Sequence, residues 1–260
     1  MEKNYVFDDF INIIRHLRSE NGCPWDREQT HESLRNCMIE EAYEVIEAIN
    51  NEDAENLCEE LGDILLQVAL HTAIAEEQKE FDIDDVVNGV SRKMIRRHPH
   101  VFGSTDAAAG IDSDAVVSNW DDIKKQEKKQ KKASEAILGV PKALPANIRA
   151  EKIQKKAAKA GLDFKDYEQA LNKVYEELEE LKKTKENGDA KGIEEEFGDL
   201  MFSVVNLSRF LQLNAENSLT NATNKFINRF VGIELLAEQE SRSLREMSDV
   251  ELNALWGRVK

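Results

Sequence analysis

An internal repeat is the feature that most constrains what this chain can fold into. The same acidic and apolar landmarks recur in the same order in both halves, as IEEAYEVIEA (39–48) with EELGDILLQV (59–68) and as YEELEELKK (175–183) with EEFGDLMFSV (195–204). The internal step is also equal, because Glu44 lies 16 residues before Glu60 and Glu180 lies 16 residues before Glu196. Such regular self-similarity indicates two copies of one supersecondary unit.

The repeated unit is expected to be helical. Apolar residues recur at helical spacing, as in the stripes Ile39, Ala42, Tyr43, Ile46, Ile49 and Leu57, Leu61, Ile64, Leu65, Val68, Thr72. No stretch alternates strictly enough to predict a strand, and four prolines and 12 glycines are few for an all-β protein with many turns. A short helical repeat rarely buries its apolar stripe alone, so we expect a homodimer.

The two repeats are separated by a segment of different composition. We predict an N-terminal repeat over residues 1–102, a linker over 103–144 and a C-terminal repeat over 145–260. The linker begins with a Gly-, Ala-, Ser- and Asp-rich stretch, read as a loop, and then holds six lysines in KKQEKKQKK. These lysines could bind polyphosphate or nucleic acid, but charge runs are usually solvated, which favours a linker helix.

Bulk charge and cysteine usage exclude several classes of protein. The formal net charge of −16 disfavours non-specific or direct nucleic-acid binding, so phosphate recognition would need a cation or a local basic cluster. Three cysteines without a Cys-x-x-Cys pair argue against a disulfide scaffold or zinc finger. No apolar run approaches the ~20 residues that span a bilayer, and the first ten residues contain no signal core. We expect a cytoplasmic protein without a membrane partner.

Carboxylates at helical spacing predict a metal site in each repeat. In the second repeat Glu177 and Glu180, and likewise Glu196 and Asp199, are three residues apart and so share a helix face. The first repeat carries the same pattern at Glu41, Glu44, Glu60 and Asp63. Four carboxylates across one antiparallel helix pair would repel unless a cation were bound. Oxygen ligands without His or Cys select Mg²⁺, or Mn²⁺; the alternative is a set of ordinary solvated glutamates.

Two pairs of basic residues and one tryptophan are candidates for the substrate. Lys93 with Arg97 and Lys225 with Arg229 are each four residues apart, which suits a polyphosphate chain, although surface ion pairing is the alternative. Trp256 could stack on a base or simply pack the last helix.

Three further features of the sequence need an interpretation. Gly62 and Gly198 are expected in the middle of helices. Each is explained by the close approach of another helix or a ligand, or by a helix that simply tolerates a glycine there. His98, Pro99 and His100 are read as a helix stop and a packed loop. The aromatic residues in GCPWD (22–26) and GLDF (161–164), Trp25 and Phe164, are read as core or pocket wall.

Together these motifs resemble the MazG family of nucleoside triphosphate pyrophosphohydrolases, in its long two-repeat bacterial form. The resemblance covers nearly the whole chain and rests on the doubled EExxE…ExxD signature, with GCPWD, RRHPHVFG, RAEKIQKKA, NKFINRF and LWGRVK. It implies two MazG-like all-α repeats, each a four-helix-bundle-type unit completed in an intertwined dimer.

The resemblance also implies an activity and a set of site residues. The activity is Mg²⁺-dependent hydrolysis of NTPs and dNTPs to monophosphate and pyrophosphate, mainly in the second repeat. The implied metal ligands are Glu177, Glu180, Glu196 and Asp199, and the implied nucleotide contacts are Lys173, Glu176, Lys225, Arg229 and Trp256, with no evident first-repeat partner to Trp256. Glu176 or Glu177 would take the proton of the attacking water.

Two other functions are kept open at this point. One is a non-catalytic helical module that senses nucleotides or binds a partner. The other is a carboxylate-bridged iron oxidase, which is weakened because that site uses Glu-x-x-His pairs and this chain has Glu-x-x-Asp instead.

Overall fold

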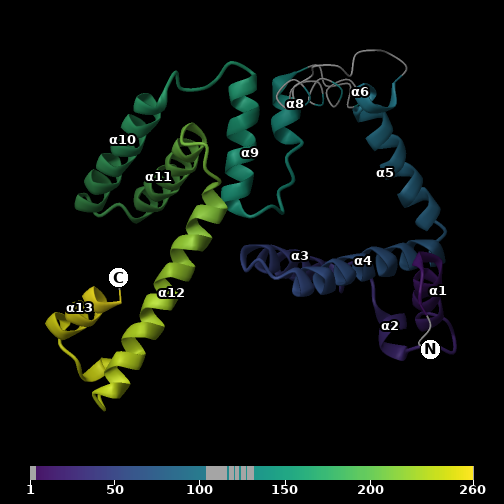
Figure 1. Ribbon diagram of the computed structural model, residues 1–260. Coiled ribbons are helices and arrows are strands. Elements are labelled where there is room, and N and C mark those ends of the chain that lie inside the picture. Colours follow the sequence, from purple (N-terminus) through teal and green to yellow (C-terminus); the bar gives the residue numbers. More distant parts are fainter. Residues whose placement is uncertain are drawn as a thin grey trace. The chain divides into compact units, whose positions relative to one another are not determined.

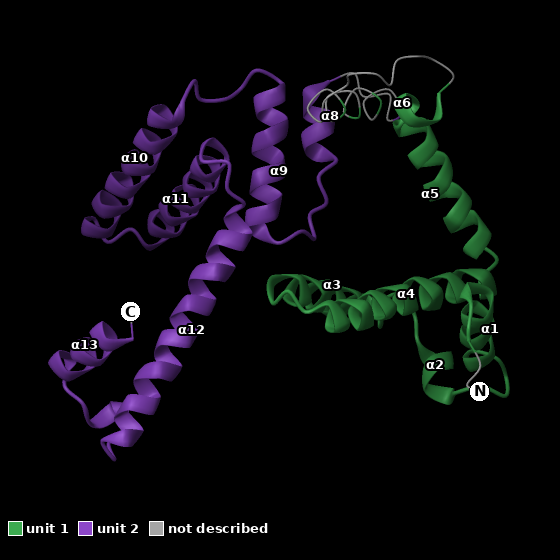
Figure 2. Cartoon of the chain, viewed as in Figure 1, with its two compact units in different colours: residues 1–124 green, residues 125–260 purple. Residues whose placement is uncertain are grey.

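The computed structural model describes residues 4–103 and 132–259, together with Val116, Trp120, Ile123 and Glu127. All regular elements within these residues are helical, which confirms the all-α prediction. The chain divides into two compact units, residues 1–124 and 125–260 (Figure 2). This division falls inside the predicted linker, whose boundaries stay a prediction. Most of the lysine run, residues 124, 125, 128, 129 and 131, lies outside the described residues.

The first unit is built around a long helical hairpin. Its helices are α1 (Phe7–Leu17), α2 (Pro24–Glu28), α3 (Arg35–Asn50), α4 (Ala54–Glu77), α5 (Ile83–Arg97) and α6 (Pro99–Phe102). Helices α3 and α4 lie side by side, and α1 packs against α4 (Figure 1). The core comprises Ile11 and Ile14 of α1, Leu34 before α3, and Leu70 and Ile74 of α4. Leu34 is almost fully buried, so truncating it to alanine would cost about 2–5 kcal/mol.

The second unit repeats the hairpin and extends it. Its helices are α8 (Ala133–Leu138), α9 (Ala146–Lys159), α10 (Tyr167–Glu186), α11 (Ala190–Phe210), α12 (Ala215–Gln239), the 3₁₀ turn η2 (Leu244–Glu246) and α13 (Asp249–Arg258). Helices α10 and α11 form the hairpin, and α9 contacts both α11 and α12 (Figure 1). Helix α13 folds back on α12 around Ile233, Ala237 and Leu255.

The two hairpins turn by the same device at positions 136 residues apart. Asp53 accepts hydrogen bonds from the backbone N–H groups of Glu55 and Asn56 and so caps α4, and Asp189 caps α11 by accepting from Gly192 N–H at 3.1 Å. The preceding residue has a left-handed backbone in both turns, with φ of 55° at Glu52 and 70° at Gly188. Equal caps and turns hold the carboxylates of each hairpin in the same register.

Large apolar side chains remain exposed on both hairpins. The predicted stripe of α3 is one such face, since Ile39, Tyr43, Ile46 and Ile49 are all exposed. On the second unit the exposed set includes Tyr175, Phe197, Phe226, Ile227 and Phe230. Large exposed apolar patches mark interaction surfaces in soluble proteins. The homodimer stays a prediction, but these faces are what it would cover.

Three of the finer sequence interpretations can be compared with the structure. Trp25 is 60% exposed and therefore does not belong to the core. A Cβ atom placed on Gly62 or Gly198 would meet nothing within 4 Å, so no element among the described residues makes the close approach suggested for them. Helix α5 does stop at Arg97, but the following residues form the short helix α6 instead of a loop, and His98 packs edge-on against Trp120.

Candidate active site

The second hairpin brings three of its predicted carboxylates together. Oxygen atoms of Glu177 on α10 and of Glu196 and Asp199 on α11 all lie within 4.8 Å of one another. Glu177 is the buried member, with 5% of its surface exposed. The hairpin makes this possible because i, i+3 residues share a face and the two helices run antiparallel. Three oxygen ligands at this separation can hold one metal ion.

The electrostatics of the cluster favour a bound cation. Burial and then the charges of Glu180, Glu177 and Asp199 raise the pKa of the Glu196 carboxyl. Glu180 is thus close enough to act on the cluster, although it is outside the three-residue set. Repulsion from these neighbours opposes the ionisation of Glu196, and a divalent cation would relieve it.

Lys173 supplies a positive charge at the edge of this cluster. Its Nζ lies 2.7 Å from a carboxylate oxygen of Glu176 and 2.7 Å from one of Glu177. These bonds raise the pKa of Lys173 well above its usual range. The contact places two residues expected to touch the nucleotide, Lys173 and Glu176, directly beside Glu177, a predicted metal ligand.

The first hairpin contains a corresponding cluster. Oxygen atoms of Glu41, Glu60 and Asp63 lie within 4.8 Å of one another. Burial, with the charges of Asp63 and Glu44, raises the pKa of Glu41, and burial followed by Glu44 raises the pKa of Glu60. The charge of Glu44 therefore acts on the first cluster in the same way as the charge of Glu180 acts on the second.

The matched positions differ in one charge. Counting 136 residues back from Lys173 gives Cys37, so the first cluster lacks the lysine that pairs with Glu177. The two candidate metal sites have the same carboxylates, but Lys173 precedes those of the second site and Cys37 precedes those of the first.

The predicted phosphate-binding pair of the second repeat lies in a pocket of its own. Lys225 and Arg229 of α12 line a pocket of about 500 Å³ with Val259. The ring centroids of Trp256 and Phe226 lie 5.6 Å apart, and Cζ of Arg229 lies 5.6 Å from the centroid of the Trp256 ring. Trp256 thus packs the last helix in this structure, while keeping a cation on its face. In the first unit, Lys93 and Arg97 are half-buried one turn apart on α5.

A second pocket, which sequence reasoning missed, adjoins the carboxylates of the second repeat. It measures about 600 Å³, lies between α9, the loop around Phe164 and α11, and is bordered by Glu177 and Asp199. Buried Gln154 and the ion-paired Arg209 are among its lining residues. Phe164 therefore belongs to a pocket wall. The signal available in the sequence was weak, because polar residues on an amphipathic helix are usually solvated.

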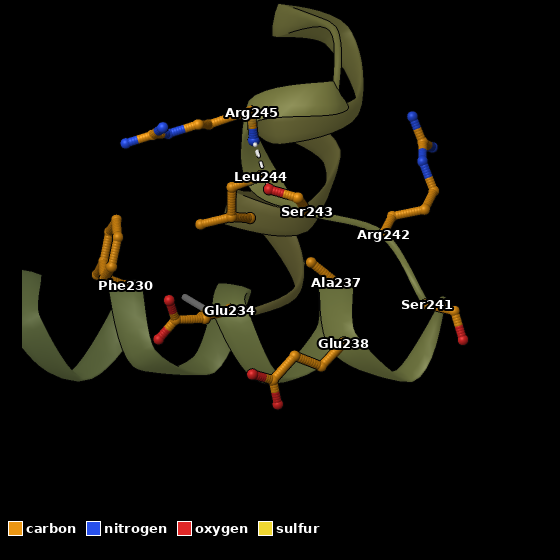
Figure 3. Close-up of a pocket in the computed structure, with 9 residues that line it drawn as sticks. All are labelled: Phe230, Glu234, Ala237, Glu238, Ser241, Arg242, Ser243, Leu244 and Arg245. Atoms are coloured by element: carbon orange, nitrogen blue, oxygen red, sulfur yellow. Dashed lines mark hydrogen bonds between the residues drawn. The ribbon is translucent and has the colours of Figure 1, made fainter.

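A third pocket is unrelated to either cluster. Figure 3 shows it between the end of α12 and the Ser241–Arg245 segment, with Glu234, Glu238, Arg242 and Arg245 around it. None of the predicted ligands lies there. Arg242 is engaged elsewhere, since it binds the carboxylate of Glu251 at 2.6 Å. This pocket therefore lies between α12 and the segment that connects it to α13.

Comparison with known proteins bears directly on the doubled hairpin. The model of the MazG nucleotide pyrophosphohydrolase domain matches this chain twice, at residues 29–102 and 165–231, and each match contains one acidic cluster. The chain belongs to the MazG nucleotide pyrophosphohydrolase family. The two hairpins are thus two MazG domains in tandem, as the repeat predicted.

Similar proteins align with 97–100% of the chain. The "Nucleoside triphosphate pyrophosphohydrolase/pyrophosphatase MazG" of Thermotoga maritima is 45% identical, covering 100% of this chain and 97% of its own. The "Nucleoside triphosphate pyrophosphohydrolase" of Escherichia coli K12 is 40% identical, covering 97% of this chain and 96% of its own. An uncharacterized Bacillus subtilis protein, YabN, is 46% identical over 98% of this chain, which spans 52% of that protein.

Within the described parts of the chain, no helix combines the length and the apolar character needed to cross a bilayer.

Proposed function

We propose that this protein hydrolyses nucleoside and deoxynucleoside triphosphates to the monophosphate and pyrophosphate. Membership of the MazG family supports this, as do the names of two full-length relatives. The observation that carries the proposal is the convergence of Glu177, Glu196 and Asp199 in the second domain. A cluster of ionised carboxylates is costly without a cation, and triphosphate chemistry needs one.

The cation that suits this site is Mg²⁺, with Mn²⁺ as a substitute. The ligand atoms are all carboxylate oxygens, which hard cations prefer. Glu177, Glu196 and Asp199 would hold it, with Glu180 completing the charge balance. When bound, the metal neutralises phosphate charge and lowers the pKa of a coordinated water.

The remaining roles are proton transfer and phosphate binding, and we assign them to side chains of this protein. Glu176, which is outside the metal cluster and half exposed, is the group that we propose takes a proton from the attacking water. Lys173, which pairs with Glu176 and Glu177, would bind a phosphate oxygen. Lys225 and Arg229 would stabilise charge on the departing pyrophosphate, Arg229 being held by its contact with Trp256.

The second domain is proposed as the main catalytic site, and the working form as a homodimer. Its cluster has Lys173, where the first domain has Cys37. The first domain retains Glu41, Glu44, Glu60 and Asp63, with Lys93 and Arg97, as a second metal and phosphate site. The exposed apolar faces of both hairpins support pairing with a second copy.

Product analysis tests the proposal. The purified protein would be incubated with each NTP and dNTP and Mg²⁺, and products followed by ³¹P NMR. We expect pyrophosphate and monophosphate in equal amounts. Release of orthophosphate alone would contradict this cleavage, and nucleotide binding without turnover would support a non-catalytic module.

A further inference from the structure

The pocket beside Glu177 has features that the phosphate chemistry does not use. It measures about 600 Å³, and its apolar lining includes Phe164 and Phe202. We infer that it binds the nucleobase of the triphosphate, and that Gln154 and Arg209 hydrogen-bond to the edge of that base. This inference rests on the proposed function, since the base is one end of the substrate whose other end meets the carboxylates.

Gln154 of α9 presents an unpaired hydrogen-bond acceptor. Its side chain is buried, with 5% of the residue exposed. The amide Nε2 donates to the backbone carbonyl of Phe202 at 2.8 Å. A carbonyl can only accept, so this bond fixes which way the amide points. The other atom, Oε1, is buried without a protein partner.

Arg209 of α11 presents an unpaired donor in the same pocket. Its terminal nitrogens donate to both carboxylate oxygens of Asp163, at 3.2 and 2.8 Å, and to the side-chain oxygen of Asn206. These bonds fix the plane of the guanidinium. Its Nε is buried and has no hydrogen-bond partner. The guanidinium is thus held by its ends, while its inner N–H is buried beside the pocket without a partner among the described residues.

An acceptor and a donor, both buried and unpaired, match the edge of a nucleobase. Every base presents N–H donors and N or O acceptors on its edge, so one ligand can satisfy both groups. Leaving buried polar groups unpaired is unfavourable, and a base bound in the pocket would satisfy both groups. The ring of Phe164 offers a surface on which the face of a base can stack.

At two matched positions the first domain lacks this pocket's polar residues, while the position that matches Gln154 holds the buried Arg18. Counting 136 residues back from Asn206 and Arg209 gives Leu70 and Ala73. Both are buried, and both belong to the hydrophobic core with Ile14 and Leu34. Matched positions on the second helix of the hairpin are therefore apolar core residues in the first domain and polar residues in the second. This difference indicates a ligand site built into the second domain.

The test compares substrates with and without a base. kcat/KM would be measured for each dNTP and for an abasic deoxyribose triphosphate, with the wild type, Gln154→Met and Arg209→Lys. Gln154→Met keeps the shape and removes the acceptor. Arg209→Lys keeps the charge that faces Asp163 and removes the Nε donor. Exposed Gln239→Met, at the end of α12, is the matched control.

We expect the wild type to prefer dNTPs to the abasic triphosphate. Each pocket variant should lower kcat/KM for dNTPs by about 10- to 100-fold, and leave the abasic substrate unchanged within about twofold. Gln239→Met should behave as wild type. If Gln154→Met does not fold, Arg209→Lys decides the question.

Two results would overturn the inference while leaving the proposed function intact. One is equal wild-type activity on dNTPs and the abasic triphosphate. The other is an equal loss on both substrates in the variants, which would make these residues structural. Failure of the wild type to release pyrophosphate from any triphosphate would instead contradict the proposed function.

Discussion

The ammonium of Lys173 lies 2.7 Å from the carboxylate of Glu177, the buried member of the second acidic cluster. Lys173 thus brings a positive charge to the cluster within the chain itself. A cation and Lys173 thus stabilise the same carboxylate, and the consequences can be separated by mutation.

Lys173→Met should lower the melting temperature of the metal-free protein by a few degrees, because Glu177 is left buried and uncompensated. Mg²⁺ should restore most of the loss, since it supplies the missing charge. Thermal unfolding with EDTA and with Mg²⁺ measures both. Cys37→Met, at the matched position of the first domain, is the control and should show no such dependence.

Glu196→Gln should stabilise the metal-free protein at pH 7 while reducing activity by more than about 100-fold. The neighbouring carboxylates and burial raise the pKa of Glu196 in the folded state. Its ionisation is therefore unfavourable to folding, and the cost grows as pH rises above the unfolded value near 4.5.

The stabilising effect of Glu196→Gln should accordingly disappear below pH 4. Melting curves across this range, with EDTA, measure it. A variant that is less stable than wild type at pH 7 would show that repulsion in the cluster is already relieved within the chain.

The hairpin turns predict a reciprocal pair of stability changes. Gly188 has a φ of 70° and open space around it, so Gly188→Ala should cost about 1 kcal/mol through backbone strain alone. Glu52 already occupies the left-handed region, with a φ of 55°, so Glu52→Gly should gain up to about 1 kcal/mol. Urea unfolding measures both, and changes of the same sign would refute the matched-turn account.

The last helix should lose a stabilising charge pair in acid. Hydrogen bonds from Arg242, then from Ser248, lower the pKa of Glu251 to about 2. A lowered pKa stabilises the fold fully above the unfolded value of about 4.5, and this contribution is lost as pH falls toward 2.

Glu251→Gln should therefore lower the melting temperature at pH 7, and the gap from wild type should narrow as pH falls below 4.5. Glu238→Gln, an exposed change on α12, is the control. A gap that stays constant with pH would show that packing, not charge, fixes α13.

Much of this architecture was predictable because it depends on local pattern. The apolar stripes and the Glu177–Glu180 and Glu196–Asp199 spacings predict an acidic hairpin, and the structure has one in each unit. The same repeat that revealed the fold also located the carboxylates. Where interactions are set within one hairpin, sequence spacing is sufficient.

The rest depends on contacts between distant segments. Gln154 reaches the Phe202 carbonyl, and Arg209 reaches Asp163, across separations of 48 and 46 residues. No periodicity indicates such pairs. Residue spacing also could not predict whether the apolar stripes are buried. Ile39 and Tyr43 lie on the predicted apolar face of their helix, yet both are exposed in a single chain.

The most direct test of the central claim is pyrophosphate release by two matched variants, Glu177→Gln and Glu41→Gln, with dNTPs and Mg²⁺. Both remove one carboxylate of an acidic cluster at the same place in the repeat. The account predicts a loss of more than about 100-fold in Glu177→Gln and a loss of less than about threefold in Glu41→Gln. Full activity in Glu177→Gln would contradict it.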